Sequence, residues 1–107
     1  MIVGACVLEL RLSNVRSLKQ KRSQIKSLLA RLRREFNLAV SETSHNDLWQ
    51  SAQISLVAVS NNRTVVEGVL RKAVIWVEIN RPDMFVVSAD IEWRKMNITE
   101  HVQLQKR

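Results

Sequence analysis

The residues of this 107-residue chain best suited to chemistry are basic side chains gathered between positions 16 and 34. The segment contains no aspartate or glutamate, yet it holds 8 of the 17 lysines and arginines. Without these eight, 9 basic residues would face 10 acidic ones, so the formal charge of +7 is a local property of this segment. Concentrated cations are suited to binding a polyanion such as nucleic acid. The eight candidates are Arg16, Lys19, Lys21, Arg22, Lys26, Arg31, Arg33 and Arg34.

A helix is needed to position these cations. Ser17 and Gln20 have the spacing of a capping box, and an apolar stripe from Leu18 to Phe36 predicts a helix that ends near Glu35. At about 100° per residue, four cations fall within roughly 60° of one another beside that stripe. Arg31 and Arg34 continue round the exposed side. The four, which we call the basic ridge, are Lys19, Arg22, Lys26 and Arg33.

Two interpretations of the basic ridge stay open. One is a solvated helix face that only keeps the protein dispersed. Such faces usually mix both signs, because opposite charges four residues apart stabilise a helix and like charges oppose it. Arg22 and Lys26 are like charges at that spacing. The sequence therefore favours the second interpretation, in which the ridge binds the phosphate backbone of structured RNA with little base readout.

A second group of candidates is His45, Asp47 and Trp49, whose side chains would point to one side if this segment were extended. His45 and Asp47 are too few to hold zinc, and adding Glu42 gives only three ligands, so we expect no metal site. One interpretation is a turn in which Asn46 and Asp47 bond to the backbone while Trp49 packs over a hairpin. The other is a functional surface loop.

Other chemistry finds little support. A phosphate-cradling loop needs glycines after the first strand, but the chain has only Gly4 and Gly68. We therefore expect neither an enzyme nor a cofactor, and no small-molecule substrate can be identified. Cys6 has no partner for an internal disulfide and is most simply a core residue. No apolar run approaches the roughly 20 residues of a membrane span, and no signal peptide is recognisable. These features predict a cytoplasmic protein without a membrane partner.

The hydrophobic pattern predicts an α+β domain over residues 1–94. Strands are expected at 2–12, 37–43, 52–60 and 85–93, with helices at about 17–35 and 63–80. Strand, helix, strand, strand, helix, strand is the order of a ferredoxin-like βαββαβ sandwich, with a four-stranded antiparallel sheet and both helices on one face. The tail at 95–107 is either an extra edge strand or disordered.

The helix-free face of this sheet offers a different kind of contact. Its central strands would expose no aromatic residue there, which argues against base stacking on them. They would instead expose a small apolar patch, and this predicts a homodimer through the open face. In that second hypothesis the protein is an interaction or scaffold module without a nucleic-acid role. The patch comprises Val3, Ala5, Val7, Val57 and Val59.

Four short segments, occurring in a fixed order, resemble the YlxP-like family of small bacterial proteins, a domain of unknown function. They lie at residues 1–4, 17–22, 45–50 and 59–61. The resemblance covers about residues 1–93 and implies a ferredoxin-like fold, and a gene often found beside translation and ribosome-maturation factors. It supplies no catalytic residues, and the tail after Trp93 is longer than the usual pattern. Together, residues and resemblance predict a non-catalytic RNA- or ribosome-associated protein whose partner is RNA or a ribosomal particle.

Overall fold

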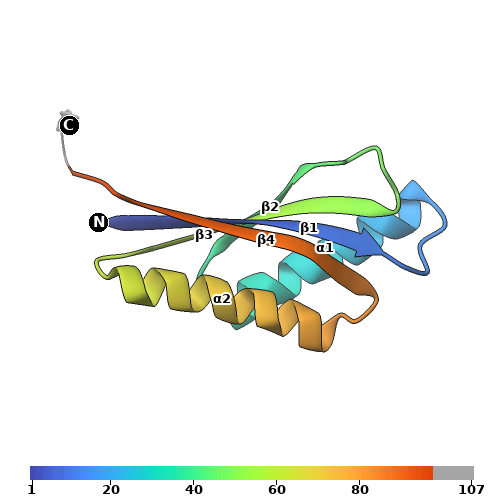
Figure 1. Cartoon of the computed structure of the whole chain (residues 1–107). Helices are drawn as coiled ribbons and strands as arrows, with labels where there is room; N and C mark the ends of the chain where they lie inside the picture. The colour runs from blue at the N-terminus through green and yellow to red at the C-terminus, as the bar shows by residue number, and fades with distance from the viewer. Residues whose placement is uncertain (98–107) are drawn as a thin grey trace, which may run out of the picture.

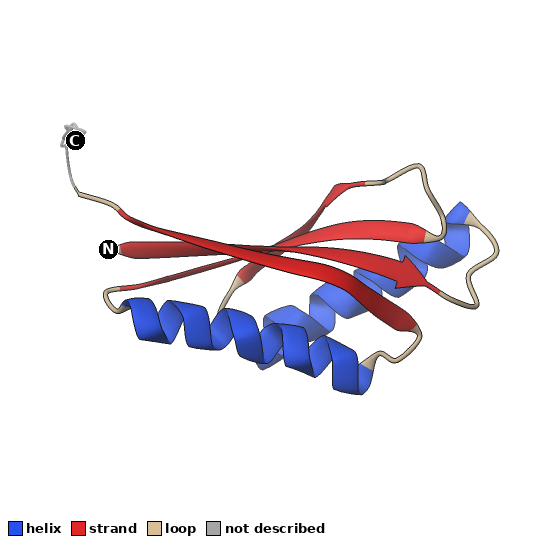
Figure 2. Cartoon of the chain, viewed as in Figure 1, coloured by secondary structure: helices blue, strands red, loops and turns tan. Residues whose placement is uncertain are grey.

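The computed structural model describes residues 1–97 as four strands and two helices in the order βαββαβ. Figure 1 shows the strands as one twisted sheet with both helices on the same side. Figure 2 shows the same two layers by type of secondary structure. The elements are β1 (Ile2–Leu12), α1 (Leu18–Glu35), β2 (Ala39–Ser44), β3 (Ser51–Ser60), α2 (Arg63–Asn80) and β4 (Met84–Lys95).

The sheet has the strand order β2-β3-β1-β4, and all neighbouring strands are antiparallel. The prediction of a ferredoxin-like sandwich with β1 and β3 at its centre is therefore confirmed. β4 is longer than predicted and ends at Lys95. The alternatives for the C-terminal tail concern mostly residues 98–107, which lie outside the described residues. In the part of the chain that is described, no helix has the length and apolar character of a membrane span.

Alternation along β1 and β3 builds the core. Leu8 and Leu10 of β1 and Ile54 and Leu56 of β3 are fully buried on the helix-facing side. Cys6 is buried among them, and burial together with the charge of Asp90 raises the pKa of its thiol to about 11. The thiol is therefore protonated at neutral pH and acts as a small apolar core residue, as expected.

Gly4 allows α2 to approach β1 closely. A Cβ atom at this position would lie 2.2 Å from Val66 Cγ1 and 3.0 Å from Leu70 Cδ1, both side chains of α2. Contacts that short do not occur between carbon atoms, so the core here requires a residue without a side chain. This gives a structural reason for the glycine in the N-terminal segment.

Both helices begin at polar N-caps. The Ser17 hydroxyl accepts a hydrogen bond from the Gln20 N–H at 3.1 Å, as its capping spacing predicted. The Gln20 side chain in turn accepts from the Arg16 N–H. At the start of α2, the Asn62 side chain accepts from Thr64 and Val65. Because a cap fixes where a helix starts, Ser17 sets the register in which the α1 cations face solvent.

Candidate nucleic-acid interface

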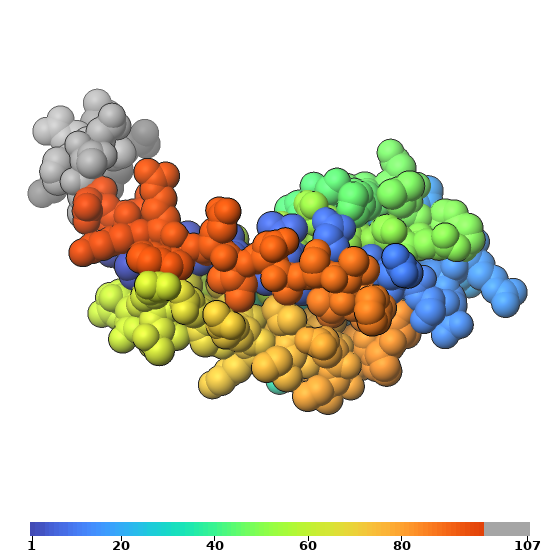
Figure 3. Space-filling view, in the orientation of Figure 1, coloured from blue at the N-terminus to red at the C-terminus, as the bar shows by residue number. Residues whose placement is uncertain are grey.

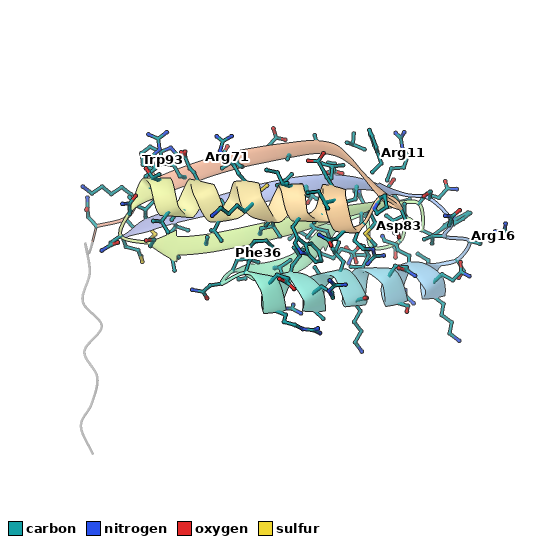
Figure 4. All side chains as sticks on the ribbon, turned by 90° about the horizontal axis from the view of Figure 1, so that it is seen from below. Arg11, Arg16, Phe36, Arg71, Asp83 and Trp93 are labelled. Carbon is teal, nitrogen blue, oxygen red and sulfur yellow. The ribbon has the colours of Figure 1, made fainter. Side chains whose placement is uncertain are left out.

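The cations of α1 lie on the buried side of the helix, on the exposed flank that forms the basic ridge, or on the flank that faces α2. The buried side of α1 is formed by Lys21, Ile25, Leu28 and Leu32. At about 100° per residue, the basic ridge is centred roughly 120° from that side. Figure 4, seen from below, shows long side chains projecting from α1 on the side away from α2. The ridge residues Lys19, Arg22, Lys26 and Arg33 are all exposed.

Lys21 was expected among the nucleic-acid-binding cations, but the structure contradicts this because its side chain is only 1% exposed. Its ammonium lies 2.9 Å from Glu42 Oε2 on β2 and donates a hydrogen bond to the carbonyl oxygen of His45. Glu42 Oε2 has no hydrogen-bond partner among the described residues, so the ammonium compensates its charge. Lys21 therefore joins α1 to β2 and to the loop that follows.

Two further cations contact their own protein. The Arg31 guanidinium lies over the Trp76 ring of α2, 5.0 Å from its centroid. The Arg33 side chain donates a hydrogen bond of 3.0 Å to the Val40 carbonyl of β2. Arg31 and Arg33 thus lie on opposite flanks of α1 and tie it to α2 and β2 respectively. Arg33 stays in the exposed ridge, although one of its nitrogens is already used.

The remaining cations of α1, together with Arg16 just before its N-cap, have no carboxylate partner within residues 1–97. Lys19 lies in the first turn, where the positive end of the helix dipole makes a cation unfavourable, and that turn contains no acidic residue. Arg34 lies in the last turn, where a cation is favourable. The local charge is therefore held at some cost to helix stability. These exposed cations are Arg16, Lys19, Arg22, Lys26 and Arg34.

The loop with His45, Asp47 and Trp49 is not extended, so the three side chains do not line up as that geometry would require. The Leu48 N–H donates to the His45 carbonyl at 3.0 Å and closes a turn, and His45 has a positive φ of 64°. Asp47 and Trp49 are exposed, and Trp49 does not pack fully over the hairpin. Lys21 donates to the same His45 carbonyl, which stabilises this unfavourable backbone conformation.

The His45 ring points to the open face of the sheet. Its Nε2 lies 2.9 Å from Glu9 Oε2, while the Gln53 amide donates to Glu9 Oε1 at 2.8 Å. The Gln53 hydrogen bond, followed by the His45 contact, lowers the pKa of the Glu9 carboxyl below its usual value. Glu42 faces the helices instead. Within residues 1–97, no three His, Cys, Asp or Glu side chains come together as metal ligands.

Lys21 therefore links the two groups of residues that the sequence singled out separately. Figure 1 shows the β2–β3 loop and the β1–α1 connection at the same end of the molecule. The Leu12 N–H donates to the Gln50 carbonyl at 2.9 Å, which fixes the far side of the loop to β1. The loop at residues 45–50 is thus a structured neighbour of the start of α1.

The open face of the sheet is apolar near the N-terminus of β1 and polar near the β2–β3 loop. Near the N-terminus of β1 lies the predicted apolar patch, in which Val59 is 60% exposed and the other four members are half-buried. Towards the loop end, the Thr43 hydroxyl donates to Gln53 and pairs with Ser55, which continues the polar network of Glu9. Asp90 and Glu92 face Val7 and Ala5 across the sheet. These two carboxylates make the half of the open face beside the apolar patch a poor surface for a polyanion.

Sequence reasoning overlooked the pair formed by Arg11 and Phe85. They are direct cross-strand neighbours of β1 and β4, so both side chains point to the open face. Phe85 is 63% exposed. The absence of exposed aromatic residues was predicted only for the two central strands, whereas Phe85 lies at the start of the edge strand β4. Its alternation with buried Met84 was the signal that could have found it.

Comparison with known proteins agrees with the resemblance noted in the sequence. A family described as "Protein of unknown function (DUF503)" matches residues 3–91. The "Uncharacterized protein YlxP" of Bacillus subtilis (strain 168) is 28% identical over 92 residues, which cover 86% of this chain and 99% of that protein. The family match spans most of the chain and includes α1, the His45 loop and most of β4. The chain therefore belongs to the DUF503 family and is similar to YlxP.

Proposed function

We propose that this protein is a non-catalytic RNA-binding protein that contacts the phosphate backbone of structured RNA through α1. The observation that carries the proposal is the set of exposed cations in and just before α1 that have no carboxylate partner in the described part of the chain. Their mutual repulsion and the position of Lys19 oppose helix stability. A bound polyphosphate would relieve both effects, whereas a face that only needs solvent would gain from mixed charges.

The extended shape of the α1 surface suits the phosphate backbone of a nucleic acid better than a small anion. The 18 residues of α1 span about 27 Å, and the basic ridge follows one flank of that rod. Cations spread over such a length contact several phosphates in turn. Affinity then depends strongly on salt, because each neutralised phosphate releases counterions. The ridge offers no built pocket for one base, so we expect little sequence preference.

The structured RNA to test first is that of ribosomal particles. This choice follows from the neighbourhood that the family resemblance implies for the gene, and the charge distribution is compatible with it. The acidic half of the open face lies on the other side of the sheet from the helices. An RNA on α1 would therefore avoid Asp90 and Glu92.

Capture from a cell extract with and without ribonuclease tests the proposal. Tagged wild-type protein should retain ribosomal RNA and lose it, with its associated proteins, after ribonuclease treatment. A variant with Lys19, Arg22 and Lys26 changed to Gln should retain much less. Arg33 is left unchanged because it also holds the Val40 carbonyl. Retention of the same partners after ribonuclease, with equal capture by the variant, would show that α1 is not an RNA-binding surface.

A homodimer through the open face is a second candidate, favoured by the exposure of Val59 beside the half-buried Val3 and Val57. Burying this patch against a second copy would remove apolar surface from water and leave α1 outside. A solution mass of twice 12.4 kDa, reduced to the monomer by Val57→Thr with Val59→Thr, is the expected result. A wild-type monomer at tens of micromolar would argue against the dimer. The RNA-binding proposal does not depend on it.

A further inference from the structure

Three connections meet at the end of the sheet where α1 begins: residues 13–17, 45–50 and 81–83. Backbone hydrogen bonds hold them together. The Ser13 N–H and hydroxyl both donate to the Asp83 carbonyl, at 3.0 and 3.1 Å. The Arg81 guanidinium binds the Asp83 carboxylate and the Gln24 side chain of α1. This end is therefore a hydrogen-bonded support that is connected to α1.

Phe85 stands on this support with most of its ring in water. Met84, the preceding residue, is buried, and Asp83 is fixed by Ser13. The backbone beneath Phe85 is thus held in place while its side chain stays 63% exposed. A large aromatic side chain on a rigid edge strand offers a flat apolar surface without the entropy loss of a mobile loop.

Arg11 is the direct neighbour of Phe85 on the same face of the sheet. Ser51 of β3 pairs with Arg11 from the other side, so Phe85, Arg11 and Ser51 form a row about 10 Å wide across three strands. Trp49 stands two residues before Ser51 and is 39% exposed. This end of the sheet therefore carries a cation and two exposed aromatic residues. Figure 3 shows β4 along the exposed edge, and the blue and green segments of the two connections beside its start.

Two of the carboxylates at this end are engaged within the protein. Glu9, two residues from Arg11, accepts a hydrogen bond from Gln53 and contacts His45. Asp83 is paired with Arg81 at 2.9 Å. Asp47 and Glu78, the latter lining a pocket with Phe85, are exposed. Arg16, just before α1, and Lys19 in its first turn add two cations to Arg11. Cations interleaved with exposed aromatic rings are the composition of a surface that binds single-stranded nucleic acid.

We infer that Phe85 and Trp49 stack unpaired nucleotides of an RNA whose helical part lies along α1, with Arg11 contacting the intervening phosphate. The inference rests on the proposed function, because α1 supplies the backbone contacts that bring the RNA to this end. It narrows the ligand to RNA in which a duplex is followed by a single-stranded segment. Stacking tolerates any base, so the preference is for unpaired structure and not for sequence.

Fluorescence anisotropy with two RNA probes tests this directly. One probe is a blunt duplex, and the other is the same duplex with a short oligoadenylate overhang, tried at either end. Wild-type protein should bind the overhang probe about 5- to 30-fold more tightly, as expected for one or two stacked bases. Phe85→Leu with Trp49→Leu should remove that gain and leave blunt-duplex affinity unchanged. Phe85→Tyr, which keeps an aromatic ring, should retain the gain.

A matched control is Ile79→Ala, which changes an exposed apolar side chain on α2 and should leave both affinities unchanged. The inference would be overturned, without affecting the proposed function, if wild type bound the two probes equally. It would also be overturned if the Phe85→Leu, Trp49→Leu variant still bound the overhang probe more tightly than the blunt one. Loss of self-association in Phe85→Leu with the RNA gain intact would assign Phe85 to a protein interface and also overturn it. Failure of the proposed function gives a different result, in which wild type binds neither probe at low salt.

Discussion

Lys21 Nζ lies 2.9 Å from Glu42 Oε2, and this buried ion pair separates one lysine of the basic helix from its exposed neighbours. The pair connects α1 to β2, and the same ammonium fixes the His45 carbonyl at the start of the loop. Lys21 therefore does not add to the exposed charge of the proposed RNA-binding surface. It holds α1 in place against the sheet. Substitution of Lys21 should therefore change the stability of the protein.

Changing Lys21 to Met should lower the free energy of unfolding by about 3 kcal/mol, because Glu42 then keeps a buried carboxylate oxygen without compensation. Lys19→Met is the matched control on the exposed ridge and should change stability by less than about 0.5 kcal/mol. Adding Glu42→Leu to Lys21→Met should recover much of the loss. Urea unfolding measures all three. Equal stability of Lys21→Met and wild type would contradict the role of the pair.

The two glycines should respond to alanine in opposite directions. Gly4→Ala places a methyl group 2.2 Å from Val66 Cγ1 and should destabilise the protein by about 1–3 kcal/mol. Gly68 lies in α2 with nothing within 4 Å of an added Cβ. Gly68→Ala should therefore stabilise the protein by about 0.5–1 kcal/mol through helix propensity. Thermal unfolding compares them, and a shift of both variants in the same direction would contradict this packing of α2.

The Asp83–Arg81 pair should contribute fully to stability above about pH 4 and progressively less in acid. Hydrogen bonds from Arg81 lower the pKa of this carboxyl in the folded state, so its contribution is complete above the unfolded value of about 3.9. It is lost as the pH falls through the folded pKa. Because the pair is partly exposed, Asp83→Asn should cost less than about 1 kcal/mol at neutral pH. Urea unfolding of both proteins at pH 7 and pH 3 should show that the difference in their unfolding free energies becomes smaller in acid. A difference that is the same at both pH values would contradict this role of Asp83.

The fold could be predicted from the sequence because its signals are local and repeated. Alternation in β1 and β3 separates the two faces of the sheet without exception from Ile2 to Leu10 and from Ala52 to Ala58. Ser17, Asn62 and Pro82 mark helix boundaries by their own chemistry. A ferredoxin-like arrangement then follows from the order of the elements.

The candidate site could be predicted only in part, because it depends on contacts between distant segments. Lys21 stands at spacings of four, seven and eleven from Ile25, Leu28 and Leu32, so helical periodicity does place it on the buried side. Its charge, however, suggested that the side chain is exposed. Only the pairing of β2 with β3 brings Glu42 under α1 and makes burial of the lysine favourable. The position of Phe85 beside Arg11 likewise depends on the register of an edge strand.

The salt dependence of RNA affinity tests the central claim most directly. Three ridge residues, Lys19, Arg22 and Lys26, are changed to Gln in one variant. A control variant carries the same charge change on the opposite edge, at Arg71, Arg94 and Lys95, which are also exposed. Circular dichroism establishes that both are folded, and affinity for a blunt RNA duplex is then measured over a range of salt concentrations.

The account predicts that the slope of log K against log salt falls by about two to three in the ridge variant and stays near the wild-type value in the control. Each lost phosphate contact removes close to one counterion from the exchange, which sets that size. Equal slopes for the wild type and the ridge variant, or an equal loss in the two variants, would contradict α1 as the RNA-binding surface.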